Sequence, residues 1–320
     1  MRMSWARLGS ILFATALLAT ACTGADEGGA GEGASVTPVG SGAGTPSTAP
    51  ETATGAFLLD LATAETTPLP ESLAEGATYV ASPDGGRLAY TRQPYVPGGS
   101  LEIANLDGTD VRTIEPSEGR TISDGARWSP DGTMLVYQEN DGVDTLGNLF
   151  VHDLASGERT RLTDLPRRYR YWFWISASFS LDGRSVIFHL PRSGSVITNW
   201  DAWSVPVSGG EPTLVLRNAT FPLYLPDGER IAFVVPAPDN FGDRIAIVSA
   251  DGSGSRRTLV DAGGQIWWPT ISPDGTRIAY AVDGSIHVVD VSTGETSEVA
   301  GGEQAEWLDD DTLVVSPGHD

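Results

Sequence analysis

Aromatic and arginine residues are concentrated in two short segments that could bind a ligand. The first, residues 166–174, reads Pro-Arg-Arg-Tyr-Arg-Tyr-Trp-Phe-Trp, and the second contains Gln265, Trp267 and Trp268. Such side chains stack on planar groups, form cation–π contacts and dominate the energy of many interfaces. We therefore predict one ligand- or partner-binding patch made of Arg168, Tyr169, Arg170, Tyr171, Trp172, Trp174, Gln265, Trp267 and Trp268.

A structural role for the same rings is the alternative. Large aromatic side chains commonly fill the space between packed units, while arginine heads stay in water and only their stems are covered. We favour this interpretation for at least half of the rings and keep the patch as the best hypothesis for a site. Replacing Trp172 and Trp268 by Ala and measuring partner binding would separate the two.

Residues that could do catalysis or hold a metal do not form a known pattern. The four histidines, His152, His189, His287 and His319, lack metal-ligand spacing, and no Gly-x-Ser-x-Gly nucleophile motif is present. Acidic runs at residues 105–110, 139–144 and 309–311 lack the spacing of a complete calcium loop and coincide with expected turns. We expect no catalytic residue, metal or cofactor, although acids gathered from distant segments in a channel would escape this test.

The amino terminus has the pattern of an export signal. Arg2 and Arg7 precede an uncharged, mainly apolar stretch at residues 11–21, which is too short to cross a bilayer as a helix. The stretch ends Leu-Ala-Thr-Ala-Cys, which resembles the bacterial lipobox, and Cys22 is the only cysteine in the chain. The resemblance implies cleavage before Cys22 and its lipidation; a plain secretory signal is the alternative.

The next segment is a predicted tether. Residues 23–55 consist mainly of Gly, Ala, Ser, Thr and Pro with a few acids and no aromatic side chain, so they cannot bury enough apolar surface to fold. We expect a signal peptide at 1–21, a lipidated, disordered linker at 22–55 and a folded domain at 56–320. The lipid alone would anchor the domain, because more than one acyl chain suffices for stable attachment.

A repeated turn organises the folded domain. Copies of Ser-Pro-Asp-Gly or a close variant are followed by apolar residues such as Leu-Ala-Tyr or Ile-Ala-Tyr. Pro presets the first turn position, Asp bonds nearby backbone N–H groups, and Gly accepts the left-handed conformation, so each copy predicts a hairpin corner. The copies begin at Ser82, Ser129, Ser180, Leu225 and Ser272, with a degenerate sixth at Leu308.

The other half of each unit is a second predicted hairpin. Its first strand is expected at residues 57–61, 101–106, 149–154, 202–207, 245–250 and 286–291. This makes six units of four strands with no helix between them. Because one four-stranded sheet cannot bury both faces alone, the units should stack around an axis as propeller blades.

The two ends of the repeat region are complementary halves. The first copy is only a second hairpin, residues 57–69, and the last is only a first hairpin, residues 306–315. We therefore predict an all-β, six-bladed β-propeller whose last blade is closed by strands from both ends, which leaves no unpaired terminal edge. A solenoid is the alternative, but it would favour separate capping ends.

The repeat carries a family resemblance. Ser-Pro-Asp-Gly-x-x-Ile-Ala-Tyr followed by an Ile-x-Val-x-Asp-type strand resembles the TolB-like, WD-repeat-related propellers over about residues 56–316. The resemblance implies the fold but not one function, since that family includes binding scaffolds and enzyme-attached domains. Propeller connectivity would place residues 166–174, and two blades later Gln265, Trp267 and Trp268, at the channel end opposite the corners.

Charge and composition narrow the function classes. All 20 basic residues are Arg, against 42 acids, which gives a net charge of −22 and makes nucleic-acid binding improbable. We predict a monomeric, non-catalytic scaffold at the outer face of the cell membrane that binds an envelope protein, a peptide or a glycan. The alternatives are a channel-centred hydrolase or lyase and a structural component of a cell-envelope assembly.

Overall fold

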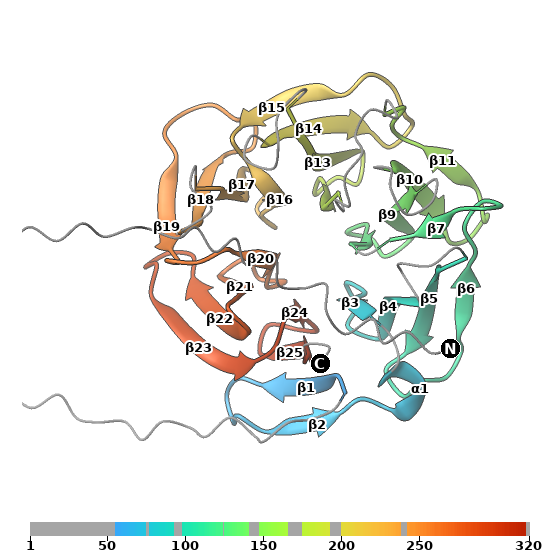
Figure 1. Cartoon of the computed structure of the whole chain (residues 1–320), viewed down its shortest axis with the longest axis horizontal. Coiled ribbons are helices and arrows are strands. Elements are labelled where there is room, and N and C mark those ends of the chain that lie inside the picture. Colours follow the sequence, from blue (N-terminus) through green and yellow to red (C-terminus); the bar gives the residue numbers. More distant parts are fainter. Residues whose placement is uncertain are drawn as a thin grey trace, which may run out of the picture. The chain divides into compact units, whose positions relative to one another are not determined.

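The repeated turns and hairpins form a ring of antiparallel sheets. The computed structural model describes residues 55–74, 77–92, 98–123, 125–140, 147–165, 175–192, 200–237 and 242–317. Within these residues the strands form six antiparallel sheets, each a blade, arranged around a central axis (Figure 1). The six-bladed all-β prediction is therefore confirmed.

Each blade runs from an inner strand beside the axis to an outer strand. Blade 1 has β3 (Ala77–Ala81), β4 (Arg87–Arg92), β5 (Ser100–Asn105) and β6 (Arg112–Ile114). Blade 2 has β7 (Thr121–Ile122) and β8 (Arg127–Trp128), which both pair with β9 (Met134–Asn140), then β10 (Asn148–Asp153) and β11 (Arg159–Arg161). Blade 3 has β12 (Ala177–Phe179), β13 (Ser185–Pro191), β14 (Trp200–Pro206) and β15 (Thr213–Arg217).

Blade 2 thus has five strands where four were expected, because two short strands, β7 and β8, take the place of one inner strand, whereas the other three blades have four strands each. Blade 4 has β16 (Thr220–Tyr224), β17 (Arg230–Val235), β18 (Arg244–Ser249) and β19 (Arg257–Asp261). Blade 5 has β20 (Trp267–Ile271), β21 (Arg277–Val282), β22 (Ser285–Asp290) and β23 (Thr296–Gly301). Blade 6 has β24 (Gln304–Trp307), β25 (Thr312–Ser316), β1 (Phe57–Asp60) and β2 (Thr66–Pro68).

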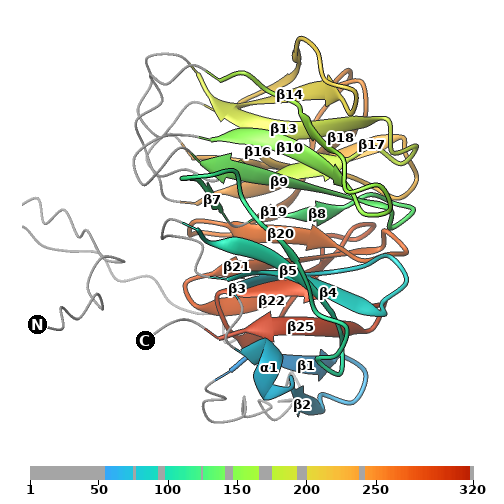
Figure 2. The ribbon, with the colours of Figure 1, turned by 90° about the vertical axis from the view of Figure 1, so that its right-hand side faces the viewer.

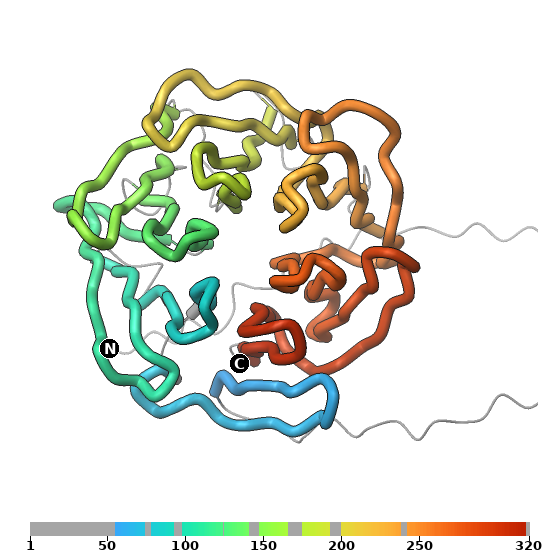
Figure 3. Tube along the Cα trace, turned by 180° about the vertical axis from the view of Figure 1, so that it is seen from behind, coloured from blue at the N-terminus to red at the C-terminus, as the bar shows by residue number. Residues whose placement is uncertain are grey.

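Blade 6 joins the two ends of the repeat region. β1 pairs antiparallel with β25, with Leu59 opposite Leu313, so the first described strand lies between β25 and β2. Figure 3 shows the blue first strands beside the red last ones. The shared blade is as predicted, and it closes the ring because the strands from the two ends complete one four-stranded sheet.

A short helix lies where only strands were expected. α1 (Glu71–Ala74) follows β2 and leads to β3, so the expectation of no helix between the units is wrong at this one place (Figure 2). Its Leu73 is fully buried, and the Tyr79 hydroxyl donates a hydrogen bond to the Leu73 carbonyl oxygen. The single turn of helix thus inserts a leucine into the contact between blades 6 and 1.

The corners have the predicted chemistry. Ser82 donates a hydrogen bond of 2.5 Å to Asp84, and Gly85 has a φ of 67°. The same Ser–Asp bond recurs at the turns that begin with Ser129, Ser180 and Ser272. These bonds, with the Ser82 bond as the largest cause for Asp84, hold the carboxyl pKa of the turn aspartates below the ordinary value.

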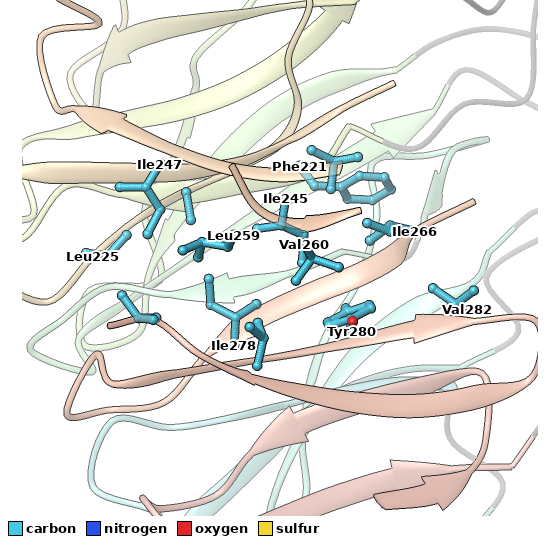
Figure 4. Packing of buried hydrophobic residues seen from close by; sticks show 14 residues of the cluster. Phe221, Leu225, Ile245, Ile247, Leu259, Val260, Ile266, Ile278, Tyr280 and Val282 are labelled. Carbon is cyan, nitrogen blue, oxygen red and sulfur yellow. The ribbon is translucent and has the colours of Figure 1, made fainter. Parts of the chain in front are cut away.

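The hydrophobic core lies between blades rather than inside one. Six clusters of buried side chains each join two neighbouring blades around the ring. Figure 4 shows the cluster of blades 4 and 5, where Ile245 and Val260 face Ile278 and Tyr280. Since every blade is apolar on both faces, closure of the ring is needed to remove that surface from water.

Candidate functional site

The candidate site is the end of the central channel at which the inner strands begin. The described connections from an outer strand to the next inner strand, such as residues 262–266, and the turn at residues 283–284 between β21 and β22 lie at this end, opposite the Pro-Asp-Gly corners. We call it the mouth. Gln265, Trp267 and Trp268 lie there, because residues 262–266 connect β19 to β20.

One position near the start of each of five inner strands has an unusual backbone conformation in most blades. This position stands six residues before the turn Asp, and its occupants in blades 1 to 5 are Thr78, Gly125, Ser176, Phe221 and Trp268. Its φ is 54° in Thr78, 95° in Gly125 and 48° in both Phe221 and Trp268. The register of β3, β16 and β20 with the second strand shifts at the same place. Such bulges redirect side chains, and a left-handed non-glycine residue persists only where surrounding contacts hold it.

Trp268 crosses the mouth from blade 5. A Cβ built on Gly125 of blade 2 would lie 3.9 Å from the Trp268 Cζ3 atom and 3.7 Å from the Ile175 carbonyl oxygen. Blades 2 and 5 face each other across the ring (Figure 1). The absence of a side chain at Gly125 therefore leaves room for the indole edge, which narrows the channel at this level.

Trp267 and Gln265 form the outer part of the same region. Trp267 is 39% exposed, and Gln265 is also exposed. The rings of Trp267 and Trp268 lie edge-on to Phe221, at 6.3 Å and 6.2 Å between centroids. The structure thus brings two predicted tryptophans together with a phenylalanine of the preceding blade.

Two further aromatic residues, His189 and Trp200, extend this group in blade 3. The His189 ring lies edge-on to Trp200 at 5.1 Å and to Phe221 at 5.3 Å, and its Nδ1 atom accepts a 3.1 Å hydrogen bond from the Phe221 backbone N–H. We call His189, Trp200, Phe221, Trp267 and Trp268 the mouth cluster. The sequence interpretation missed its first three members, although aligning the copies on the turn Asp would have placed Phe221 at the position of Trp268.

A polar side chain of one blade holds the start of the next inner strand. His189 stands seven residues after its turn Asp, and the equivalent residue of blade 2 is Gln138. The Gln138 Oε1 atom accepts a 2.6 Å hydrogen bond from the Ile175 backbone N–H, as His189 does from Phe221. His189 thus has a structural contact to the next blade. His287 stacks on Tyr280, burial lowers the pKa of His152, and His319 lies outside the described residues.

Asp243 fixes the loop that carries Gln265 and leads to Trp267 at the start of β20. Its carboxylate accepts hydrogen bonds from the backbone N–H groups of Ala237 and Ile266, at 3.0 Å and 3.1 Å. Its own backbone bonds Gly264 and Ala262 at 2.9 Å and 3.0 Å. Burial raises the pKa of the Asp243 carboxyl, and the two accepted bonds oppose that shift. The loop is therefore held by side-chain and backbone hydrogen bonds within the chain.

A second contact crosses the channel below Trp268. The Glu306 carboxylate of blade 6 lies 3.9 Å from an Arg127 guanidinium nitrogen of blade 2 and accepts a 3.0 Å hydrogen bond from the Thr270 hydroxyl. Burial raises the pKa of Glu306, while the Arg127 charge and the Thr270 bond lower it. Channel-facing polar residues of three blades thus contact one another.

The remaining predicted site residues are not placed. Arg168, Tyr169, Arg170, Tyr171, Trp172 and Trp174, together with Cys22, lie outside the described residues. In the part of the chain that is described, no three His, Cys, Asp or Glu side chains are grouped so that they could hold a metal ion. Of the acidic runs, Asp107 and Asp309 accept hydrogen bonds within their own turns, as turn chemistry predicts.

The amino-acid sequence was compared with protein families and with known proteins. No protein-family model matches the chain. Over 250 residues it is 28% identical to Tricorn protease homolog 1 of Streptomyces coelicolor, a match that covers 73% of this chain and 22% of that protein. The chain therefore spans about a fifth of the length of this relative.

Solved structures resemble a larger share of the chain. A protein from Agrobacterium tumefaciens assigned as a TolB matches with a TM-score of 0.64 and 18% identity, over 83% of this chain and 98% of that one. The fold is that of a TolB-like six-bladed β-propeller. TolB from Acinetobacter baumannii matches with a TM-score of 0.56 and 15% identity over 83% of this chain and 64% of that one.

The TolB-like propeller also resembles an enzyme. An oligogalacturonate lyase in complex with manganese matches with a TM-score of 0.52 and 19% identity, over 76% of this chain and 71% of the lyase. At such identities the likeness concerns the fold alone. Separately, no helix in the described segments is long and apolar enough to span a membrane.

Proposed function

We propose that this protein is a membrane-anchored, extracytoplasmic lipoprotein whose TolB-like propeller binds a protein, a peptide or a glycan at its mouth without catalysis. The observation that carries the proposal is Trp267, which is 39% exposed at the start of β20, directly after a loop held in place by Asp243. An exposed aromatic side chain on a strand gives contact area at a small entropic cost, which is typical of binding hot spots.

The channel contacts support binding at the mouth rather than chemistry along the axis. Trp268 reaches Gly125 across the ring, and the Arg127–Glu306 pair crosses the channel below it. A substrate entering from the mouth would meet both contacts on its way along the axis. Binding on the mouth surface requires no such displacement.

Export and anchoring rest on the amino-terminal pattern. Arg2 and Arg7, the apolar stretch and the lipobox-like sequence before Cys22 favour lipidation of that residue. The TolB proteins are similar in fold, which is compatible with this location. Intact-mass measurement of the protein from membranes should show acyl chains on wild type, and Cys22→Ala should yield unmodified protein in the soluble fraction. Wild-type protein without acyl chains would contradict the anchor.

A site-specific photocrosslinker at Gln265 tests the binding function. Gln265 is exposed and two residues from Trp267, so a partner at the mouth should be captured from solubilised membranes as one discrete adduct. Trp267→Ala should abolish the adduct, whereas Leu214→Ala should not. Leu214 is the matched control, because it is 38% exposed but lies on the outer strand β15. An adduct unaffected by Trp267→Ala would contradict the proposal.

The enzyme hypothesis has one observation in its favour. Glu306 is a channel carboxyl whose pKa is raised by burial, a property shared with general acids, and the fold resembles that of a lyase. A channel-centred hydrolase or lyase would lose turnover in Glu306→Gln while keeping its partner adduct. An envelope structural component would instead co-purify with one partner in fixed proportion.

A further inference from the structure

We infer that the mouth takes a cationic peptide segment of its partner, at the side where blades 4 and 5 meet. The inference rests on the proposed function and gives the chemistry of the partner. The residues concerned are Asp261, Gln265, Trp267 and Asp283, which we call the mouth ledge. They lie at the end of β19, on the connection to β20, at the start of β20 and in the turn after β21.

The two carboxylates lie beside the loop that leads to Trp267. A Cβ built on Gly264 would lie 3.0 Å from an Asp283 carboxylate oxygen, so Gly264 permits this close approach. A Cβ on Gly242 would lie 3.7 Å from an Asp261 carboxylate oxygen and 3.8 Å from the Gly263 Cα atom. Both carboxylates therefore border the short connection that Asp243 holds in place.

Neither carboxylate is neutralised inside the described part of the chain. Both are exposed, and no hydrogen bond or ion pair with a described residue engages them. Arg244 stands opposite Asp261 in the β18–β19 pairing, but the two side chains do not form an ion pair. In contrast, Asp201 at the same end of blade 3 is paired with Arg192 at 2.6 Å. The mouth ledge thus has unpaired carboxylates, whereas the carboxylate of blade 3 is neutralised by an arginine of its own blade.

A connection that two exposed carboxylates border and that leads to an exposed aromatic ring suits a peptide with guanidinium or ammonium groups. The ring attracts the cation electrostatically and the carboxylate accepts its hydrogen bonds. This chain uses the same pairing internally, because Arg277 lies over Trp307 at 5.0 Å and Arg87 over Trp128 at 4.9 Å. The net charge of −22 adds a long-range attraction for cationic segments and a repulsion for anionic glycans.

Fluorescence anisotropy with the full-length protein tests the inference. The probes are three labelled peptides of equal length, Gly alternating with Arg, with citrulline or with Glu. Citrulline keeps the shape of Arg without its charge. We expect the Arg peptide to bind roughly tenfold or more tighter than the citrulline peptide, and the Glu peptide not to bind.

Variants distinguish binding at the mouth ledge from attraction by the overall negative charge. Trp267→Ala and the double change Asp261→Asn with Asp283→Asn should each weaken the Arg peptide by roughly 3- to 30-fold. The matched controls are Leu214→Ala and the double change Glu229→Gln with Glu295→Gln, which removes two charges from turns at the opposite end of the ring. Equal thermal unfolding midpoints would show that the variants are folded.

Three outcomes overturn the inference. The first is equal affinity for the Arg and citrulline peptides. The second is an equal loss of affinity for the Arg peptide in the Asp261→Asn/Asp283→Asn and Glu229→Gln/Glu295→Gln variants. The third is tight binding of a neutral glycan at Trp267. If these occur while the Gln265 adduct still depends on Trp267, the cationic class is wrong and the binding function stands. If the adduct also ignores Trp267, both proposals are wrong.

Discussion

The guanidinium carbon of Arg277 lies 5.0 Å from the centre of the Trp307 ring, and this contact joins blade 5 to the blade that closes the ring. The Trp307 indole N–H also donates a 3.3 Å hydrogen bond to the Thr270 carbonyl oxygen. Blades 1 and 2 repeat both contacts, with Arg87 over Trp128 and the Trp128 N–H on the Val80 carbonyl at 3.1 Å. The pair is therefore a recurring inter-blade contact. Its arginine is the second residue after one Ser-Pro-Asp-Gly turn, and its tryptophan is the residue directly before the next copy of the turn.

The Arg277–Trp307 contact should be measurable by a double-mutant cycle. Trp307→Ala should lower the free energy of unfolding by about 3–5 kcal/mol, because a buried ring is removed. Arg277→Ala should cost less, and the coupling between the two changes should be about 0.5–1 kcal/mol. Urea denaturation gives all four values, and a coupling of zero would show that the stacking has no energetic role.

His189 should be replaceable by glutamine but not by leucine. Its Nδ1 atom accepts the Phe221 N–H, and Gln138 makes the same bond to Ile175 one blade earlier. His189→Leu should cost about 1–3 kcal/mol, because it leaves a buried N–H without its acceptor. His189→Gln should recover most of that loss in thermal or urea unfolding. Equal stability of the Leu variant and wild type would contradict this role.

Two turn glycines differ only in their surroundings. Gly183 and Gly275 have φ values of 67° and 73°, but a Cβ at Gly275 would lie 2.9 Å from the Pro226 Cδ atom, whereas Gly183 has open space. Gly183→Ala should cost about 1–2 kcal/mol from backbone strain alone. Gly275→Ala should cost about 1–3 kcal/mol more, because the proline ring must move. Equal urea midpoints for the two variants would contradict the contact between turns.

Stability should pass through a maximum at mildly acidic pH. Glu306 and Asp243 have raised pKa values, so their contribution is present when they are protonated and is lost as the pH rises through the folded pKa. Turn aspartates such as Asp84 and Asp131 have lowered pKa values, so their contribution is present above the ordinary 3.8 and is lost below it.

Chemical denaturation between pH 3 and 8 would check this profile. Glu306→Gln should flatten the decline from mildly acidic to neutral pH and leave the acid limb unchanged, because the turn aspartates remain. Stability that rises steadily toward neutral pH in wild type would show that the buried carboxyls do not carry the predicted linkage.

The architecture was predictable because its signals are local. A Pro-Asp-Gly corner needs only neighbouring residues to form, and its repetition at similar spacing indicates equivalent blades. The complementary halves at residues 57–69 and 306–315 also predicted the shared blade. Within the described residues, α1 departed from that prediction, since one buried leucine in a four-residue turn gives too weak a periodic signal, and so did blade 2, where β7 and β8 replace a single inner strand.

The sequence by itself determined the blades, their number and the place of Gln265, Trp267 and Trp268 at the mouth. Tertiary structure alone decided that Trp268 reaches Gly125, that His189 holds Phe221 and that Arg127 meets Glu306. These partners stand 143, 32 and 179 positions apart along the chain. Their contacts depend on bulges that turn side chains toward the axis and on the ring closing to a particular width. Neither condition is encoded in a local pattern, because both arise from the packing of six blades against one another.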